Sequence, residues 1–87
     1  MEWTVEYTLH ALEDINSFKE HGDTAALKKI RQLVESIQKT PFGGIGKPEP
    51  LKYALSGCWS RRINKKHRLV YEVRGNTVSI LSAQGHY

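Results

Sequence analysis

The sequence predicts an α+β domain in which a helical hairpin packs on a twisted antiparallel sheet. Two amphipathic stretches follow one another in the first half of the chain, separated by a short turn that contains glycine. This arrangement predicts an antiparallel pair of helices. Four short runs of strand-forming residues follow, each bounded by turn-forming residues, and one more run precedes the helices. The expected order is therefore one strand, two helices and a meander of four strands.

The first strand is expected over residues 2–7, where apolar and polar residues alternate. Thr8 is a suitable N-cap for a first helix over residues 9–20. The apolar residues of that helix recur at spacings of three and four, as a buried helical face requires. They are Ala11, Leu12, Ile15 and Phe18.

The second helix is expected over residues 24–39. His21 and Gly22 end the first helix, since glycine readily adopts the backbone that stops a helix. Asp23 or Thr24 then caps the second helix. Its apolar face consists of Leu27, Ile30, Leu33, Val34 and Ile37.

Residues 40–50 cannot extend this helix, because they include all three prolines of the chain and three of its glycines. Beyond them, alternating and β-branched residues predict further strands. These are expected at residues 51–55, 58–64, 68–74 and 77–83, with turns at 56–57, 65–67 and 75–76.

The sequence predicts one soluble domain, residues 1–87, that stays in the cytoplasm. A chain of this length holds a single hydrophobic core. No stretch approaches the roughly 18 apolar residues of a membrane span, and the first residues lack the basic and apolar regions of a secretion signal. The single cysteine, Cys58, excludes an internal disulfide and fits a reducing compartment.

The positive charge of the chain is concentrated in one region. Residues 45–68 contain seven basic residues and one acid, so their net charge is +6, whereas the whole chain carries +4 and the remainder therefore −2. An isolated basic cluster is as often a solvated face as a binding surface. Here the concentration favours a polyanionic partner.

Glu49 is the one carboxylate inside this basic region, and it stands between Pro48 and Pro50. Prolines stiffen the backbone on both sides of it. Taken alone, Glu49 is more simply a counter-ion for Lys47 or Lys52 than a catalytic group.

Basic residues of adjacent strands could converge on a phosphate, for which the planar guanidinium of arginine is well shaped. The alternative is a charged sheet edge that deters aggregation. Strand register decides which arginines cooperate with Arg68. A two-residue turn at 65–66 places Arg68 on the face of Arg61, whereas a three-residue turn at 65–67 places it on the face of Arg62 and Ser60.

His86 and Tyr87 are the last two residues of the sequence, and a terminal pair is usually frayed. The last strand precedes them closely, so the short link Gln84-Gly85 could hold them on the sheet. The remaining reactive or aromatic side chains are better read as structural or surface residues, and no metal-ligand spacing or phosphate-binding glycine motif is present. These residues are His10, His21, His67, Cys58, Trp3, Trp59 and Tyr71.

Four blocks of the second half, in order, carry a family resemblance. They are Thr40-Pro41-Phe42-x-Gly44-x-Gly46-Lys47-Pro48-Glu49-Pro50-Leu51-Lys52, Leu55-Ser56-Gly57-x-Trp59-Ser60-Arg61-Arg62-Ile63, His67-Arg68-Leu69-Val70-Tyr71 and His86-Tyr87. In the first half, Ala11-Leu12-Glu13-Asp14 is a looser match.

These blocks resemble the YoeB/Txe family of the RelE superfamily, which are toxins of toxin–antitoxin systems. The sequence departs from the family at Cys58, where an aromatic residue is usual, and at Gly85, where a bulkier residue is common. The resemblance implies a fold like that of microbial ribonucleases and cleavage of mRNA in the ribosomal A site.

The resemblance also implies a role for each candidate residue. Glu49 would be the general base on the ribose 2′-OH and His86 the general acid for the departing 5′-oxygen. Arg68 would stabilise the charged phosphoryl group, helped by Lys52 and Arg62. Tyr87 would assist at the scissile bond. No cofactor or metal is required. The substrate-binding candidates are Lys52, Arg62, Lys47 and Arg61.

The implied partners are the mRNA on the ribosome and an antitoxin resembling YefM, with operator DNA contacted only through the antitoxin complex and a homodimer possible by analogy. Two other functions stay open. One is a gyrase poison of the ParE type, which leaves the conjunction of Glu49, Arg68 and a terminal His-Tyr unexplained. The other is a nucleic-acid-binding module without catalysis, whose binding would depend strongly on salt.

Overall fold

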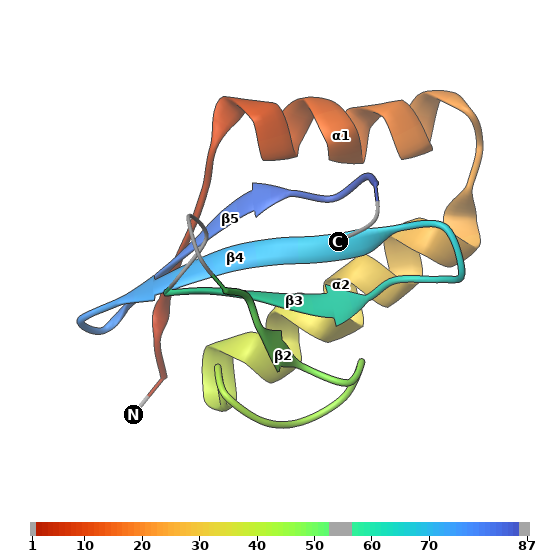
Figure 1. Cartoon of the computed structure of the whole chain (residues 1–87). Coiled ribbons are helices and arrows are strands. Elements are labelled where there is room, and N and C mark those ends of the chain that lie inside the picture. Colours follow the sequence, from red (N-terminus) through yellow and green to blue (C-terminus); the bar gives the residue numbers. More distant parts are fainter. Residues whose placement is uncertain (1, 53–56, 86–87) are drawn as a thin grey trace.

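Two helices and five strands make up the part of the chain that the structure, a computed structural model, describes: residues 2–52 and 57–85 (Figure 1). In chain order they are β1 (Thr4–Tyr7), α1 (Leu9–Glu20), α2 (Thr24–Lys39), β2 (Glu49–Pro50), β3 (Cys58–Arg62), β4 (Arg68–Arg74) and β5 (Thr77–Ser82).

Both helices have the predicted bounds. The Thr8 side chain accepts a hydrogen bond from the backbone N–H of Ala11, and the Asp23 side chain accepts one from that of Ala26. Each cap thus satisfies an N–H that the first turn of a helix leaves without a partner. The expected choice between Asp23 and Thr24 is thereby settled in favour of Asp23.

The sheet has the strand order β1-β5-β4-β3-β2. Strands β2 to β5 form the predicted antiparallel meander, but β1 pairs with β5 in parallel, so the sheet is mixed rather than wholly antiparallel. The cause is the crossover: the two helices carry the chain from β1 to the opposite edge of the sheet. The meander then returns in alternating directions and ends beside β1 (Figure 1).

Four strand predictions need adjustment. β1 begins at Thr4, two residues later than expected. The strand expected at residues 51–55 is replaced by the two-residue β2, and residues 53–56 lie outside the described part of the chain. β3 ends at Arg62, two residues earlier than expected, and β5 ends at Ser82, one residue earlier. The register of β4 on β5 shifts between Val70 and Tyr71, which leaves Leu81 without a partner in β4.

The hydrophobic core lies between the helices and one face of the sheet. Burying such side chains stabilises a domain by about 25 cal/mol for each Å² of apolar surface removed from water. In α1 the apolar stripe is only partly buried, since Leu12 is 49% exposed. The core residues are Ala11, Phe18, Ala26, Ile30, Leu33, Ile37, Ile63, Leu69, Tyr71, Val78, Ile80 and Ala83.

The second face of the sheet points away from this core and is polar. Strand alternation together with the pairing of β3 and β4 assigns Ser60, Arg62, Arg68 and Val70 to it. Within the described ranges, neither helix has the length and apolarity needed to cross a membrane.

Candidate functional site

Arg68 is the central charged residue of the second face. It begins β4 opposite Arg62 of β3, and its side chain is only 10% exposed. Its Nε donates a hydrogen bond to Oγ of Ser60 over 3.0 Å, and Ser60 is fully buried. Among the residues that the structure describes, Arg68 Nη2 finds no hydrogen-bond partner. Nη2 is itself buried, so an anion that reaches this donor would receive a charge-assisted hydrogen bond.

Glu49 lies beside Arg68. It pairs with Ser60 across β2 and β3, so its side chain shares the second face. One carboxylate oxygen, Oε2, is 4.0 Å from Arg68 Nη2, while the Glu49 side chain remains 62% exposed. The two groups are close enough to contact one phosphodiester together, yet the carboxylate stays open to a substrate.

Three other predicted basic residues are exposed, and one of them, Arg62, lies opposite Arg68 across β3 and β4. The other two are Lys47 and Lys52. Lys47 has a positive φ of 52° in the turn before β2, a conformation that is uncommon outside glycine. A cavity of about 250 Å³ is bordered by Lys47, Arg62 and also Lys29 of α2. Sequence reasoning missed Lys29, because nothing in a helical pattern links it to a loop 18 residues later.

Arg61 does not belong to this site, and its assignment as a substrate-binding residue is a correction. Its side chain points to the helix-covered face and is fully buried. Its guanidinium donates to Oη of Tyr71 at 3.0 Å, Oγ of Ser36 at 2.8 Å and the carbonyls of the preceding loop. Those carbonyls belong to Ile45, Thr40 and Gly43.

The register explains why the two neighbouring arginines separate. Arg62 is opposite Arg68 and Arg61 is opposite Leu69, so Arg68 groups with Arg62 and Ser60, as the three-residue turn predicts. The connection itself is longer than either expected turn, because residues 63–67 all lie between the strands. The side chain of Asn64 accepts hydrogen bonds from the N–H groups of Lys66 and His67 and so holds this connection.

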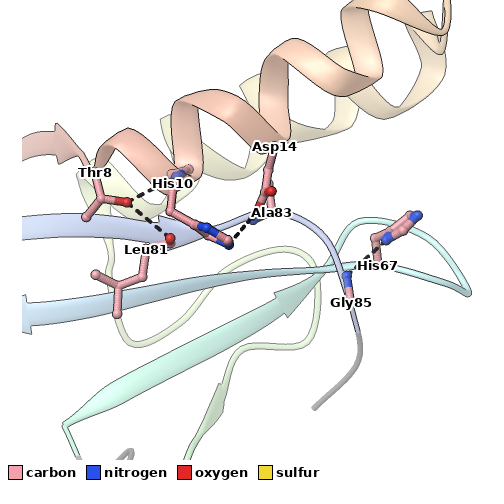
Figure 2. Close-up of polar contacts among 8 residues, drawn as sticks. Thr8, His10, Asp14, His67, Leu81, Ala83 and Gly85 are labelled. Atoms are coloured by element: carbon pink, nitrogen blue, oxygen red, sulfur yellow. Dashed lines mark hydrogen bonds and ion pairs between the residues drawn. The ribbon is translucent and has the colours of Figure 1, made fainter.

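His86 and Tyr87 lie outside the described residues, so their predicted roles remain predictions. The residue before them is anchored, as Figure 2 shows in part: the N–H of Gly85 donates to Nδ1 of His67 over 3.0 Å. The carbonyl of Gly85 accepts from the N–H of Arg68, also over 3.0 Å. The predicted link from β5 to the last two residues therefore runs beside Arg68.

Cys58 and Tyr71 are structural, as expected. Burial, aided by the charge of Glu72, raises the pKa of the Cys58 thiol, which disfavours the reactive thiolate. Burial also raises the pKa of Tyr71, although its hydrogen bond with Arg61 acts in the opposite direction. Across the described ranges, no three His, Cys, Asp or Glu residues lie close enough to hold a metal ion.

Sequence reasoning missed Ser60, Asp14 and His67 as supporting residues. Asp14 left a signal, since it lies three residues after Ala11 and four before Phe18, on the buried side of α1. A carboxylate at such a position is expected to have a specific partner. Ser60 was placed on the face of Arg68 by only one of the two expected turns. His67 left no signal, because its importance depends on the path of the chain after β5.

The chain is similar to known toxins over nearly its whole length. A family model for the YoeB-like toxin of bacterial type II toxin–antitoxin systems matches residues 7–87. The toxin YoeB of Synechocystis sp. is 52% identical over 68 residues, which are 78% of this chain and 79% of that protein. The YoeB dimer from Staphylococcus aureus has a TM-score of 0.88 and 42% identity, with 100% of both chains covered.

A second Staphylococcus aureus structure, the YoeB–YefM complex, has a TM-score of 0.85 and 41% identity, again with 100% of both chains covered. The family match includes the segments that carry Glu49, Arg68 and Gly85. The likeness therefore extends over the second face of the sheet as well as the core.

Proposed function

Because the chain belongs to the YoeB-like toxin family of bacterial type II toxin–antitoxin systems, we propose that it cleaves mRNA in the ribosomal A site and so inhibits translation. The proposed reaction is an attack of a ribose 2′-OH on the adjacent phosphorus. It breaks the bond to the 5′-oxygen of the next nucleotide and leaves a 2′,3′-cyclic phosphate and a 5′-hydroxyl.

The observation that carries this proposal is the free N–H of a buried Arg68 next to an exposed carboxylate. Arg68 is held by Ser60, while its Nη2 has Glu49 as a neighbour at 4.0 Å and no hydrogen-bond partner within the described ranges. A phosphate bound there would receive a charge-assisted hydrogen bond where negative charge develops. Pre-positioned donors of this kind act without further reorganisation.

Glu49 is the proposed general base, because an acceptor beside the phosphate site can take the proton of the attacking 2′-OH. His86 is the proposed general acid that protonates the departing 5′-oxygen, and Tyr87 assists at the same bond. Base and acid must act on opposite sides of phosphorus in an in-line displacement. Gly85 is bonded to the backbone of Arg68, which supports a role for the residue after it at the same phosphate.

The exposed residues Lys47, Lys52 and Arg62 are proposed to hold the phosphates on either side of the scissile bond. Their charges lie around the site rather than in it, so they contribute binding more than chemistry. Positioning of the message by the ribosome supplies the rest of the alignment, and correct alignment lowers the barrier substantially.

The test is cleavage of a defined mRNA on programmed ribosomes. Glu49→Gln and His86→Gln are each expected to lower the cleavage rate by about 100-fold or more, on the usual scale of acid–base catalysis. Glu13→Gln, the same substitution at an exposed position of α1, is the control and should cut like wild type. Near-normal cleavage by either site variant would refute its assignment.

The proposed partners follow from the same family membership. We infer an antitoxin resembling YefM, since a relative forms a YoeB–YefM complex, and self-association, since a relative is described as a dimer. Operator DNA would be bound through the antitoxin complex alone. A supercoiling assay with gyrase separates this function from the ParE type, because a ribonuclease leaves supercoiling unchanged.

A further inference from the structure

The end of β5 and the backbone that follows it are held by four hydrogen bonds to groups distant in sequence. On the α1 side, Thr8 Oγ1 donates to the carbonyl of Leu81 over 3.1 Å, and Asp14 Oδ2 accepts from the N–H of Ala83 over 2.9 Å (Figure 2). The other two bonds hold Gly85, whose N–H and carbonyl both have a partner in the pair His67 and Arg68.

Burying the carboxylate of Asp14 costs free energy unless the carboxylate has partners. Asp14 is only 9% exposed, on the core-facing side of α1, and its partner Ala83 is fully buried. His10 is the one basic residue recorded against it within the described ranges, with Nε2 at 3.4 Å from Oδ2. A buried carboxylate is tolerated when it accepts well-formed hydrogen bonds, and its bond to a buried N–H is stronger than one between neutral groups.

His67 is bound to the tail through a nitrogen that must be unprotonated. The Gly85 N–H donates to Nδ1, so the ring carries its proton on Nε2. The other side of the ring packs edge-on against Phe18 of α1, with centroids 5.2 Å apart. The ring is therefore held between α1 and the tail.

Gly85 turns the chain at this point. Its φ is +101°, which side chains other than glycine rarely adopt, although a Cβ would meet nothing within 4 Å. Its carbonyl is bonded to the N–H of Arg68 itself. Gly85, the last residue that the structure describes, is thus bonded directly to the backbone of Arg68.

We propose that Asp14 and His67 are positioning residues, which fix the backbone from Ala83 to Gly85 beside Arg68 so that His86 starts from a defined place. The proposal rests on the proposed function, in which His86 is the acid. Releasing an ordered residue multiplies the accessible backbone states by about 10-fold. Loss of either anchor should therefore lower the cleavage rate at saturating ribosomes by about 10-fold or more, with little change in binding.

The sharpest variants are at His67. His67→Phe keeps an aromatic ring against Phe18 but removes the acceptor, whereas His67→Asn loses the ring and places an amide oxygen near the position of Nδ1. The expected result is a kcat about 10-fold or more below wild type for His67→Phe, an unchanged KM and recovery of most of kcat in His67→Asn. His21→Phe, at an exposed histidine of the same cavity, is the control.

A merely structural role predicts the opposite order, because His67→Asn would then be the more damaged variant. The same pair of changes applies at Asp14: Asp14→Asn keeps an acceptor for the Ala83 N–H, while Asp14→Leu removes it. A melting temperature for each variant separates loss of folded protein from loss of rate.

The anchoring can also be tested on the wild-type chain, where no substitution can impair folding. Nitrogen-15 NMR should show the His67 ring protonated on Nε2, and the amide of Gly85 should exchange with solvent far more slowly than in an unstructured peptide. Exchange of Gly85 at the unstructured rate would overturn the anchoring, whatever the activity is.

The two proposals fail in different ways. If His86→Gln cuts mRNA normally, the proposed acid is wrong, and slow exchange at Gly85 still tests the anchor. If His86→Gln is inactive while His67→Phe has lost the slow exchange and keeps full kcat, the positioning inference alone is overturned.

Discussion

Replacing Arg61 by alanine should strongly destabilise the folded protein while leaving the proposed catalytic residues unchanged. The guanidinium is fully buried and makes five hydrogen bonds, two of them to the side chains of Tyr71 and Ser36. A hydrogen bond to a charged group contributes about 1.5–3 kcal/mol. The carbonyls of the loop can turn to water, so only the two side-chain bonds are counted.

On that count Arg61→Ala should lower the free energy of unfolding by about 3 kcal/mol or more. A chain of this length is stable by about 4–13 kcal/mol in total. The same loss lowers the melting temperature of so small a domain by about 12–24 °C. Urea titration followed by circular dichroism measures the change directly.

Arg62→Ala is the matched control one residue away. Arg62 is exposed on the second face, so its loss should change stability by no more than about 0.5 kcal/mol, while it weakens binding of RNA and reduces cleavage. The reasoning is refuted if Arg61→Ala lowers the free energy of unfolding by less than about 1 kcal/mol, the usual net contribution of one neutral hydrogen bond. It is equally refuted if folded Arg61→Ala loses cleavage as Arg62→Ala does.

Three further changes test the core and its edges. Tyr71→Phe should lower the free energy of unfolding by about 1–3 kcal/mol, because it removes the bond from Tyr71 Oη to the carbonyl of Pro41 and an acceptor of Arg61. Burial raises the pKa of Tyr71, so this contribution is full below pH about 10 and is lost as the pH rises further. An unchanged difference from wild type at higher pH would contradict the argument. Gly46→Ala should destabilise the protein by about 2–4 kcal/mol, because a Cβ there would lie 2.5 Å from Leu33 at a φ of +84°. The control Gly75→Ala, at a φ of +59° and facing open space, should destabilise it by only about 1–2 kcal/mol. Equal urea midpoints for the two variants would contradict the packing argument. Because its pKa is raised, Cys58 should react with iodoacetamide much more slowly in the folded chain than in the urea-unfolded chain. Cys58→Ala should cleave mRNA at the wild-type rate. Fast labelling of the folded chain would contradict this account.

Local patterns were sufficient for the helices. The bounds of α1 and α2 follow from caps and apolar spacing, which are properties of adjacent residues, and both were predicted in full. The parallel pairing of β1 with β5 could not be predicted in this way, because it depends on where the crossover returns the chain and not on the residues of β1.

The candidate site was predictable in composition but not in geometry. The resemblance supplied Glu49 and Arg68, and the structure places them 4.0 Å apart. The resemblance names Arg62 beside Arg68, but the charge pattern cannot separate Arg61 from Arg62, since two adjacent arginines differ only by the face they take. A shift of one residue in the register exchanges them, and the connection at residues 63–67 that sets the register is longer than a standard hairpin turn.

The residues that anchor the backbone after β5 were harder to predict. Thr8 was predicted as a helix cap, yet its hydroxyl also bonds the carbonyl of Leu81, 73 residues later in the sequence. His67 was read as a turn residue, and only the path of the chain after β5 reveals that it holds Gly85. These two contacts are set by tertiary structure, so no sequence pattern predicts them; of the anchors, Asp14 alone left a signal, as a carboxylate on the buried side of α1.

The central claim, cleavage by the ribose 2′-OH beside Glu49 and Arg68, is tested most directly by removing the nucleophile from the substrate. A message on programmed ribosomes would carry a single 2′-deoxy nucleotide on the 5′ side of the bond that the protein cuts in the A site. The account predicts that this bond stays intact while the all-ribose message is cut to a 2′,3′-cyclic phosphate and a 5′-hydroxyl. Cleavage of the deoxy message at the same bond would contradict it.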